Sequence, residues 1–143
     1  MADTLNTLKT RRSCRAYTSE HVEEEKLNAI IEAGTYAATG MGKQSPIILV
    51  IKDPAVHEQL RKLNAAAMGM DIDPFYGAPD LLVVLANKDI PTYIYDGSLV
   101  MGNMMNMIIG RLVERIDVEE GNKITIKYRV SFEQFMNKEQ ASA

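Results

Sequence analysis

The sequence predicts one domain of mixed helix and strand, in which helices cover the faces of a parallel or mixed sheet. Two segments, 47–52 and 80–87, each contain a continuous apolar run that is typical of a strand buried on both faces. Asp53 and Pro54 begin a helix between these runs, as a capping residue and a first-turn proline, and this order of elements favours a layered sheet. At 143 residues the chain is long enough to form one domain with a real core.

Two helices are predicted in the N-terminal part, with a basic segment between them. The first is short, carries Leu5 and Leu8, and ends near Thr10. The second opens on the acidic run 23–25, where negative charge complements the positive end of the helix dipole. Apolar residues at helical spacing from 27 to 34 then give this helix one buried face.

Loops, a long helix and a hairpin are predicted around and after the two strands. Residues 37–46 contain two glycines and a proline, so they predict a loop whose backbone can approach a planar ligand closely. Residues 73–79 form a turn-rich connection, and residues 91–110 predict a long helix. Apolar and polar residues alternate along 112–130 on either side of a turn, which indicates a β-hairpin. Residues 132–143 predict a short helix with a frayed end.

Composition and charge exclude several classes of protein. The formal net charge of -3 argues against a dedicated nucleic-acid binder, because no excess positive field attracts a polyanion. The single cysteine, Cys14, excludes an internal disulfide and a cysteine zinc site. Apolar runs such as 47–51 are too short to cross a bilayer and no signal peptide opens the sequence, so we expect a cytoplasmic protein without a membrane partner. Paired carboxylates and a serine–histidine–aspartate set are absent from the sequence, and His21 and His57 are expected to have surface roles.

Basic residues cluster immediately after the first predicted helix. Arg11, Arg12 and Arg15 lie within residues 11–15 together with Ser13 and Cys14. Arginine offers a rigid, permanently charged fork of donors that matches phosphate oxygens, and serine adds a hydroxyl at close range. The cluster therefore predicts either a site for a phosphate-bearing cofactor or a solvated basic turn.

Several short segments of the sequence occur in a characteristic order and spacing. They are 11–15 (RRSCR), 37–46 (AATGMGKQSP), Asn64, 73–79 (DPFYGAP), 96–98 (DGS) and 102–105 (GNMM). Each is a weak signal alone, and their combination is a strong one. On these segments, residues 1–106 resemble the FMN-dependent nitroreductase family. The resemblance implies an α+β fold with a mixed sheet flanked by helices, which forms a tight homodimer with two FMN molecules in its interface.

The resemblance also implies which residues hold the cofactor. The family's ligands of the FMN phosphate and ribityl chain match one basic segment of this chain: Arg11, Arg12, Ser13 and Arg15. The family's loop alongside the isoalloxazine ring, which typically comes from the partner subunit, matches a second group: Ala38, Thr39, Gly40, Gly42 and Gln44. Asn64 is similar to an asparagine that hydrogen-bonds the ring region.

The reaction that the resemblance implies is a two-step hydride transfer. Family members take hydride from NADH or NADPH onto the flavin and pass it to nitroaromatics, quinones or similar small-molecule acceptors. Because the flavin supplies the chemistry, the protein positions it, tunes it with hydrogen bonds and shapes the pocket. We therefore predict an FMN-dependent oxidoreductase with no catalytic side chain and no metal site.

The sequence departs from the family at two places. Gly42 stands where many members have asparagine, so backbone replaces one side-chain contact near the flavin. After residue 108 the family's further strands and its C-terminal basic phosphate ligand are absent, and residues 109–137 instead resemble the C-terminal end of large serine recombinases. We interpret the chain as a single truncated nitroreductase-like domain, whose family-like part is 1–108, fused to an unrelated hairpin and tail, 109–143.

The predicted hairpin has the period and length to fill the sheet edge that the missing strands leave open. The apolar residues expected to face the helices are Ile116, Val118, Ile124 and Ile126. A basic residue of the hairpin is a candidate for the missing phosphate ligand: Lys123, Lys127 or Arg129. Two alternatives to an active enzyme remain, a flavin-binding protein with little turnover and a DNA-associated remnant. The second is the least favoured, because acidic residues offset the basic ones in the tail.

Overall fold

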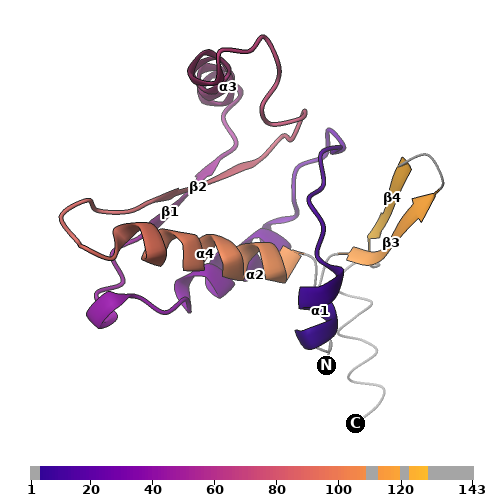
Figure 1. Ribbon diagram of the computed structural model, residues 1–143. Helices are drawn as coiled ribbons and strands as arrows, with labels where there is room; N and C mark the ends of the chain where they lie inside the picture. Colours follow the sequence, from indigo (N-terminus) through magenta and orange to yellow (C-terminus); the bar gives the residue numbers. More distant parts are fainter. Residues whose placement is uncertain (1–3, 109–112, 120–122, 129–143) are drawn as a thin grey trace.

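The computed structural model describes residues 4–108, 113–119 and 123–128, the last two segments as strands only. Its elements are α1 (Thr4–Thr10), α2 (Glu24–Thr35), the 3-10 helix η1 (Gly40–Gly42), β1 (Ile47–Ile51), α3 (Pro54–Met68), β2 (Leu81–Leu85), α4 (Tyr93–Met107), β3 (Val113–Glu119) and β4 (Lys123–Tyr128). Helices α2 and α4 lie side by side below the β1–β2 pair, whereas α3 lies beyond the far end of these strands (Figure 1). The helices and strands predicted within residues 4–108 are confirmed, with ends that differ by a few residues.

Helix α3 begins where the sequence predicts a helix start. The Asp53 carboxylate accepts the backbone N–H groups of Ala55 and Val56, both at 2.9 Å, and Pro54 occupies the first turn. Gly69 ends the helix in the left-handed conformation, with φ at 66°, which glycine adopts without steric cost. Capping chemistry therefore fixes both ends of α3.

The strands β1 and β2 run antiparallel, which corrects the expected parallel or mixed sheet. They pair from Ile47 opposite Leu85 to Ile51 opposite Leu81. A parallel pair needs a connection that crosses over the sheet. Here α3 stays beyond the strand ends, and the chain returns through residues 69–80 to enter β2 from the same end (Figure 1). The apolar strands suit either direction, and the path of the connection sets the antiparallel one.

Strands β3 and β4 also pair antiparallel, with an irregularity between Val113 and Arg115. Among the described strands, β1–β2 and β3–β4 are two separate two-stranded sheets. The expected position of this hairpin at the edge of the first sheet is therefore not confirmed. The expected roles of the hairpin side chains and the helix predicted at 132–143 lie outside the described residues.

The core lies between α2, α4 and the inner face of the β1–β2 sheet. Its buried members are Ile30, Ala37, Val100 and Met104. Partly buried apolar side chains pack against them: Ile48, Leu82, Val84, Met107 and Ile108. The side chains of Ile48, Leu82 and Val84 alternate along their strands with exposed or half-buried ones, so one sheet face belongs to this core.

Gly34 allows α2 to approach β1 and α4 closely. A Cβ atom at this position would lie 2.8 Å from Ile48 Cδ1 and 2.9 Å from Met104 Cγ, so only glycine fits without displacement. Asn103 on α4 adds a polar link, since its Nδ2 donates to the carbonyl oxygen of Ala33 at 3.0 Å. The relative position of the two helices is fixed by both contacts.

Candidate functional site

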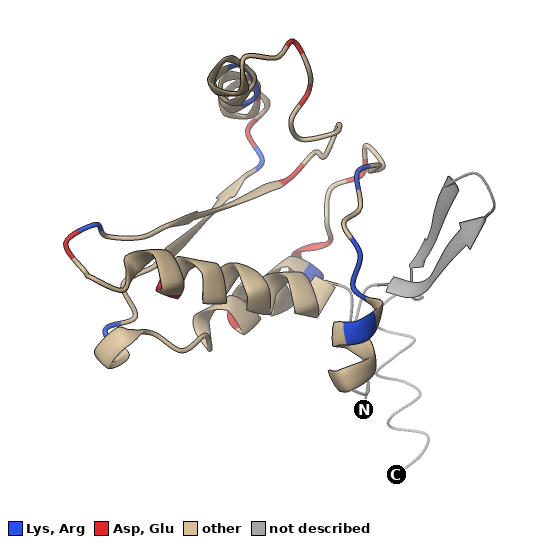
Figure 2. Ribbon diagram, in the orientation of Figure 1, with Lys and Arg blue, Asp and Glu red and all other residues tan. Residues whose placement is uncertain are grey.

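The basic segment 11–15 leaves the C-terminal end of α1 and continues as irregular chain (Figure 2). Nη1 of Arg12 donates to the carbonyl oxygens of Lys9 and Arg11, both at 2.9 Å. A guanidinium in this position caps the free carbonyl groups at the end of the helix. Ser13 and Arg15 are exposed, and Arg11 is half-buried. Of the predicted phosphate ligands, Arg12 is therefore engaged with its own helix.

Arg15 connects the basic segment to a distant part of the chain. Its Cζ atom lies 5.9 Å from the centroid of the Tyr76 ring. This distance is within the range of an attractive contact between a cation and an aromatic ring. The contact brings together two of the segments that carry the family resemblance, 11–15 and 73–79. Tyr76 was not among the predicted site residues; an aromatic side chain within a turn-forming segment was the signal for it.

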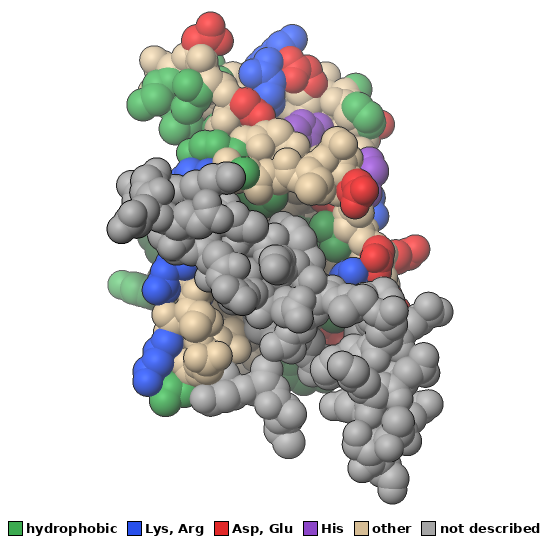
Figure 3. Space-filling view, turned by 90° about the vertical axis from the view of Figure 1, so that its right-hand side faces the viewer, with side chains coloured by type: hydrophobic (Ala, Val, Ile, Leu, Met, Phe, Trp, Pro, Cys, Tyr) green, Lys and Arg blue, Asp and Glu red, His purple; other side chains and the backbone are tan. Residues whose placement is uncertain are grey.

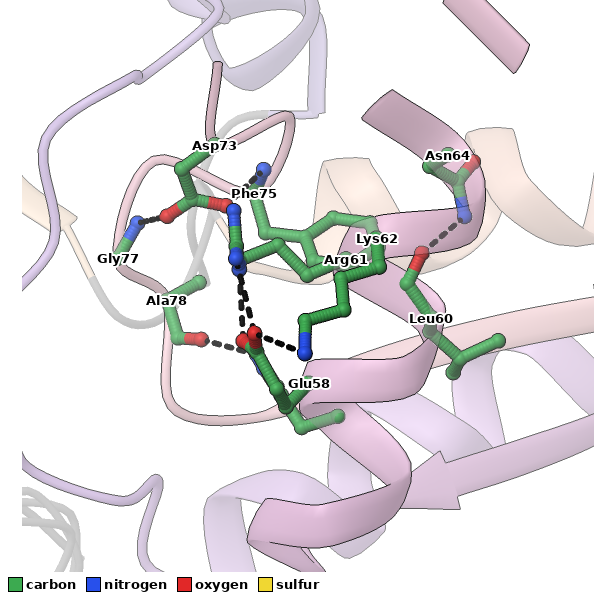
Figure 4. Close-up of polar contacts among 10 residues, drawn as sticks. Glu58, Leu60, Arg61, Lys62, Asn64, Asp73, Phe75, Gly77 and Ala78 are labelled. Atoms are coloured by element: carbon green, nitrogen blue, oxygen red, sulfur yellow. Dashed lines mark hydrogen bonds and ion pairs between the residues drawn. The ribbon is translucent and has the colours of Figure 1, made fainter. Parts of the chain in front are cut away.

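The 73–79 turn is built by one aspartate and one histidine. The Asp73 carboxylate accepts the N–H of Phe75 at 3.0 Å and that of Gly77 at 2.6 Å (Figure 4). Nε2 of His57 on α3 lies 2.8 Å from the carbonyl oxygen of Ala78, and the His57 ring packs edge-on against Phe75. His57 is partly buried here, which corrects its expected surface role.

Charged side chains cover the adjoining face of α3. Nε and Nη2 of Arg61 donate to the two carboxylate oxygens of Glu58 at 2.7 and 2.8 Å (Figure 4). The hydrogen bonds from Arg61, with a smaller contribution from Lys62, lower the pKa of Glu58 to about 2. Glu58 is thus ionised at neutral pH and does not exchange protons in a reaction there.

Asn64 lies on α3 but does not join the Arg15–Tyr76 contact. Its Nδ2 donates to the carbonyl oxygen of Leu60 at 2.9 Å, one turn earlier in the same helix. Figure 4 shows its side chain directed away from the Asp73–Ala78 turn. In this conformation the side-chain amide of Asn64 is hydrogen-bonded within its own helix. A rotation about its side-chain bonds makes the amide available to another partner.

The second predicted group of site residues forms a tight turn around η1. Thr39 Oγ1 accepts the N–H of Gln44 at 3.0 Å, and Met41, Gly42 and Gln44 all have positive φ. A Cβ atom on Gly42 would meet no atom within 4 Å, so the backbone there is open to a neighbouring molecule. Ala38 is exposed and Gly40 half-buried. The turn therefore offers exposed backbone, as the sequence predicts for a loop beside a planar ligand.

The two groups of predicted site residues lie at different ends of the domain. The turn around η1 precedes β1, whereas α3 and the 73–79 turn lie beyond the other end of that strand (Figure 1). Residues 11–15, the first group, contact the 73–79 turn through Tyr76. The described chain thus brings Arg15 to the 73–79 turn but does not bring either to the turn that contains Thr39, Gly40 and Gly42.

Asp96 is a polar residue of this region that sequence reasoning did not single out by itself. It is 2% exposed, and its carboxylate accepts the N–H of Gly40 and the hydroxyl of Thr92, both at 2.9 Å. It is also the one charged residue within α4 (Figure 2). A lone charge in an otherwise uncharged helix was the signal that could have identified it.

The described part of the chain gives little support for a metal site, a membrane span or a reactive cysteine. Within it, no group of three metal-binding side chains is close enough to hold an ion, and no helix is long and apolar enough to cross a membrane. Burial raises the pKa of the Cys14 thiol, so the less reactive protonated form prevails at neutral pH. In Figure 3, the Lys and Arg side chains of the described residues form separate groups, and Asp and Glu side chains lie at the top and along the opposite edge of the same face.

Residues 8–109 match the nitroreductase family. A nitroreductase with bound FMN from Bacteroides fragilis is 25% identical with a TM-score of 0.69, over 79% of this chain and 67% of that one. One with bound FMN from Desulfitobacterium hafniense is 24% identical with a TM-score of 0.70, over 79% and 68%. An FMN-dependent nitroreductase from Clostridium difficile is 24% identical with a TM-score of 0.64, over 73% and 54%.

These matches define the class of the protein. The packed pair of helices under a small antiparallel sheet is a nitroreductase-like fold, and the family match covers most of the chain. The chain belongs to the nitroreductase family. It spans 54–68% of the length of the three solved structures. No curated protein sequence matches it.

Proposed function

We propose that this chain binds FMN and acts as a flavin-dependent oxidoreductase. It passes hydride from NADH or NADPH through the flavin to a small-molecule acceptor, such as a nitroaromatic compound or a quinone. Family membership and the FMN-bound nitroreductases of the same fold support this function. The observation in the structure that carries it is the contact of Arg15 with Tyr76, which joins a basic segment to a rigid turn.

The residues of the basic segment suit a phosphate group. Arg15 and Ser13 are exposed and present charged and hydroxyl donors on the same stretch of chain, with Arg11 close by. Arg12 contacts the phosphate as well once its guanidinium leaves the carbonyl oxygens at the end of α1. Water then replaces the guanidinium as the hydrogen-bond donor to these oxygens. A bound flavin supplies the hydride-accepting and hydride-donating ring, and the protein's part is to anchor and orient it.

A second copy of the chain completes the proposed site. Ile94 and Tyr95 on α4 are 61% and 71% exposed, and Leu99 and Met105 are also exposed on the same helix. A helix that is apolar around its whole circumference is normally buried on all sides. A homodimer through α4 covers these side chains and allows the turn at 39–44 of one subunit to approach the basic segment of its partner. Asn64 is proposed to reach the ring region in the same assembly.

Absorbance spectra of the purified full chain test the proposed function. The protein is expected to retain a yellow colour after gel filtration with excess FMN, and to lose it on anaerobic addition of NADH or NADPH. Arg15→Ala is expected to weaken FMN binding about tenfold or more, since it removes a charged hydrogen-bond donor. Lys88→Ala, which removes an exposed charge from the turn after β2, is the matched control. A protein that takes up no FMN at all contradicts the proposal.

A flavin-binding protein with little turnover is the second candidate. The family match ends at residue 109. We propose that the residues after it came from a fusion of a truncated gene with a mobile element, and that they stand in place of part of the family's structure. FMN-bound protein that stays yellow with both nicotinamide cofactors supports this candidate over the first. We further propose a cytoplasmic location, where both nicotinamide cofactors are present.

A further inference from the structure

Asp96 is a buried carboxylate whose hydrogen bonds reach a distant turn. Its Oδ1 accepts the N–H of Gly40 and its Oδ2 accepts the hydroxyl of Thr92, each at 2.9 Å. At 2% exposure, a carboxylate has lost nearly all of its hydration, and such a group persists only when hydrogen bonds replace the water. Its contact with Gly40 links α4 to a turn 56 residues earlier in the chain.

Gly40 fits closely into the surface formed by Thr92. A Cβ atom on Gly40 would collide with the side chain of Thr92, including its Cγ2 at 2.8 Å. Asp96 and Thr92 therefore hold Gly40 in a position that no larger residue could occupy. The rest of the turn depends on this anchor, because the N–H of Lys43 donates to the carbonyl oxygen of Gly40 at 3.2 Å.

The residues after Gly40 adopt backbone conformations that need support. Met41 and Gln44 have φ values of 54° and 45°, in the left-handed region that residues other than glycine rarely occupy. The N–H of Gly42 and that of Gln44 both donate to Thr39, to its carbonyl oxygen and its hydroxyl respectively. Local hydrogen bonds shape the turn, and Asp96 is its fixed point on the core.

We propose that Asp96 is the positioning residue for the turn at 39–44, which it holds in its binding conformation before the flavin arrives. The inference rests on the proposed function, because that function makes this turn the wall beside the flavin ring. Asp96 touches no reacting atom and acts through the amide of Gly40. Preorganisation of this kind lowers the cost of ordering the turn when the ligand binds.

Hydrogen exchange of the flavin-free protein tests the positioning role. Asp96→Ala is expected to speed exchange of the Gly40, Gly42 and Lys43 amides about tenfold or more relative to the amides of β1, since a hydrogen bond to a charged group is lost. In Asp96→Asn, the amide oxygen still accepts the N–H of Gly40, and the amide N–H donates to the hydroxyl oxygen of Thr92. This variant is therefore expected to restore slow exchange. Exchange that is unchanged in Asp96→Ala, or faster by the same factor throughout the chain, overturns the proposal.

Asp53→Ala provides the matched control. Asp53 is also an aspartate that accepts two hydrogen bonds at 2.9 Å, but it caps α3 at the opposite end of β1. Its loss is expected to leave exchange in the 39–44 turn unchanged relative to β1. If Asp53→Ala loosens the turn as much as Asp96→Ala does, the turn responds to general destabilisation and the proposal fails.

FMN titration then tests the consequence for binding. Asp96→Ala is expected to raise the Kd for FMN about tenfold, Asp96→Asn and Asp53→Ala to change it less than about twofold. A turn that loosens in Asp96→Ala without any change in Kd overturns the positioning role in binding. If the unaltered chain binds no FMN, the proposed function fails, and the exchange experiment still decides whether Asp96 fixes the turn.

Discussion

Asp80 shows how a single carboxylate joins two parts of this chain. Its side chain is 4% exposed, and it accepts hydrogen bonds from His21 Nδ1 and from the N–H of Val22, both at 2.7 Å. Burial by itself raises the pKa of Asp80, but the hydrogen bonds from His21 and Val22 outweigh it and lower the pKa overall. Asp80 thus holds the residues before α2 against the start of β2.

Asp80→Asn is expected to lower the free energy of unfolding at pH 7 by about 1–3 kcal/mol, because a charged acceptor is lost. A carboxyl group whose pKa is lowered by folding contributes its stability fully above its unfolded pKa of about 4. The contribution disappears as the pH falls through the lower pKa of the folded state. Urea unfolding across pH 2–7 measures this, and the two proteins should converge at the acid end. A constant difference across the whole range contradicts the role assigned to Asp80.

Gly34→Ala is expected to destabilise the protein by about 1–2 kcal/mol, since overpacking against Ile48 and Met104 outweighs the gain in helix propensity. Gly97→Ala on α4 is the control. A Cβ atom on Gly97 would lie 3.7 Å from Ala86 Cβ, an ordinary contact, so this change is expected to be neutral or to stabilise by up to about 1 kcal/mol. Thermal unfolding of both variants compares them, and equal melting temperatures would argue against the close approach at Gly34.

At the scale of elements, local chemistry predicted helix starts well. The acidic run at 23–25 and the pair Asp53–Pro54 each lie at the start of an observed helix, because dipole and capping effects act within one turn. The direction of β2 was wrong in the prediction, since the apolar run at 81–85 fits a parallel or an antiparallel neighbour equally well. The direction of β2 follows from the position of α3 beyond the strand ends, and the residue pattern of the strands does not predict that position.

Features of the site residues that depend on residue type were predicted, and those that depend on three-dimensional position were not. The open backbone of Gly42 followed from residue type and is confirmed by the structure. The capping of α1 by Arg12 and the anchoring of Gly40 by Asp96 were not predicted, because both depend on where a side chain lies in three dimensions. The roles of these residues toward FMN stay predictions.

Helix α4 leads to a prediction about assembly. The double variant Ile94→Glu and Leu99→Glu places two charges on its exposed apolar face and is expected to convert the proposed dimer to a monomer at micromolar concentration. Sedimentation velocity measures the change, and circular dichroism checks that the helices persist. Leu63→Glu, on an equally exposed apolar position of α3, is expected to leave the dimer intact. A monomeric unaltered chain refutes the dimer directly.

At the scale of the whole molecule, the separation of the basic segment from the 39–44 turn makes a complementation test possible. Arg15→Ala disables the first group of site residues, and Gly40→Val disables the second through its collision with Thr92. If each site draws one group from each subunit, a mixed dimer of the two variants contains one intact site. After unfolding and refolding together, an equal mixture should recover about a quarter of the FMN sites of the unaltered protein, since half of the dimers are mixed.

Each variant refolded alone is expected to retain little FMN through gel filtration, because its affinity is weakened about tenfold or more, and this provides the baseline for the mixture. Recovery of no sites in the mixture, with mixed dimers present, means that each subunit holds its own flavin. The titration counts sites from the flavin absorbance that stays with the protein after gel filtration.

The uniform apolar character of β1 and β2 has a consequence for folding. Both faces of the sheet carry only aliphatic side chains, with Ile48 inside the core and Ile47 and Leu49 exposed on the other face. In most sheets, a slip of one residue is prevented because it would expose apolar and bury polar side chains. Here a slipped pairing exchanges one aliphatic face for another. The correct pairing is therefore expected to depend on anchors outside the strands, such as Asp96 on Gly40 before β1, and Asp96→Ala should increase the fraction of chains that refold with shifted strands.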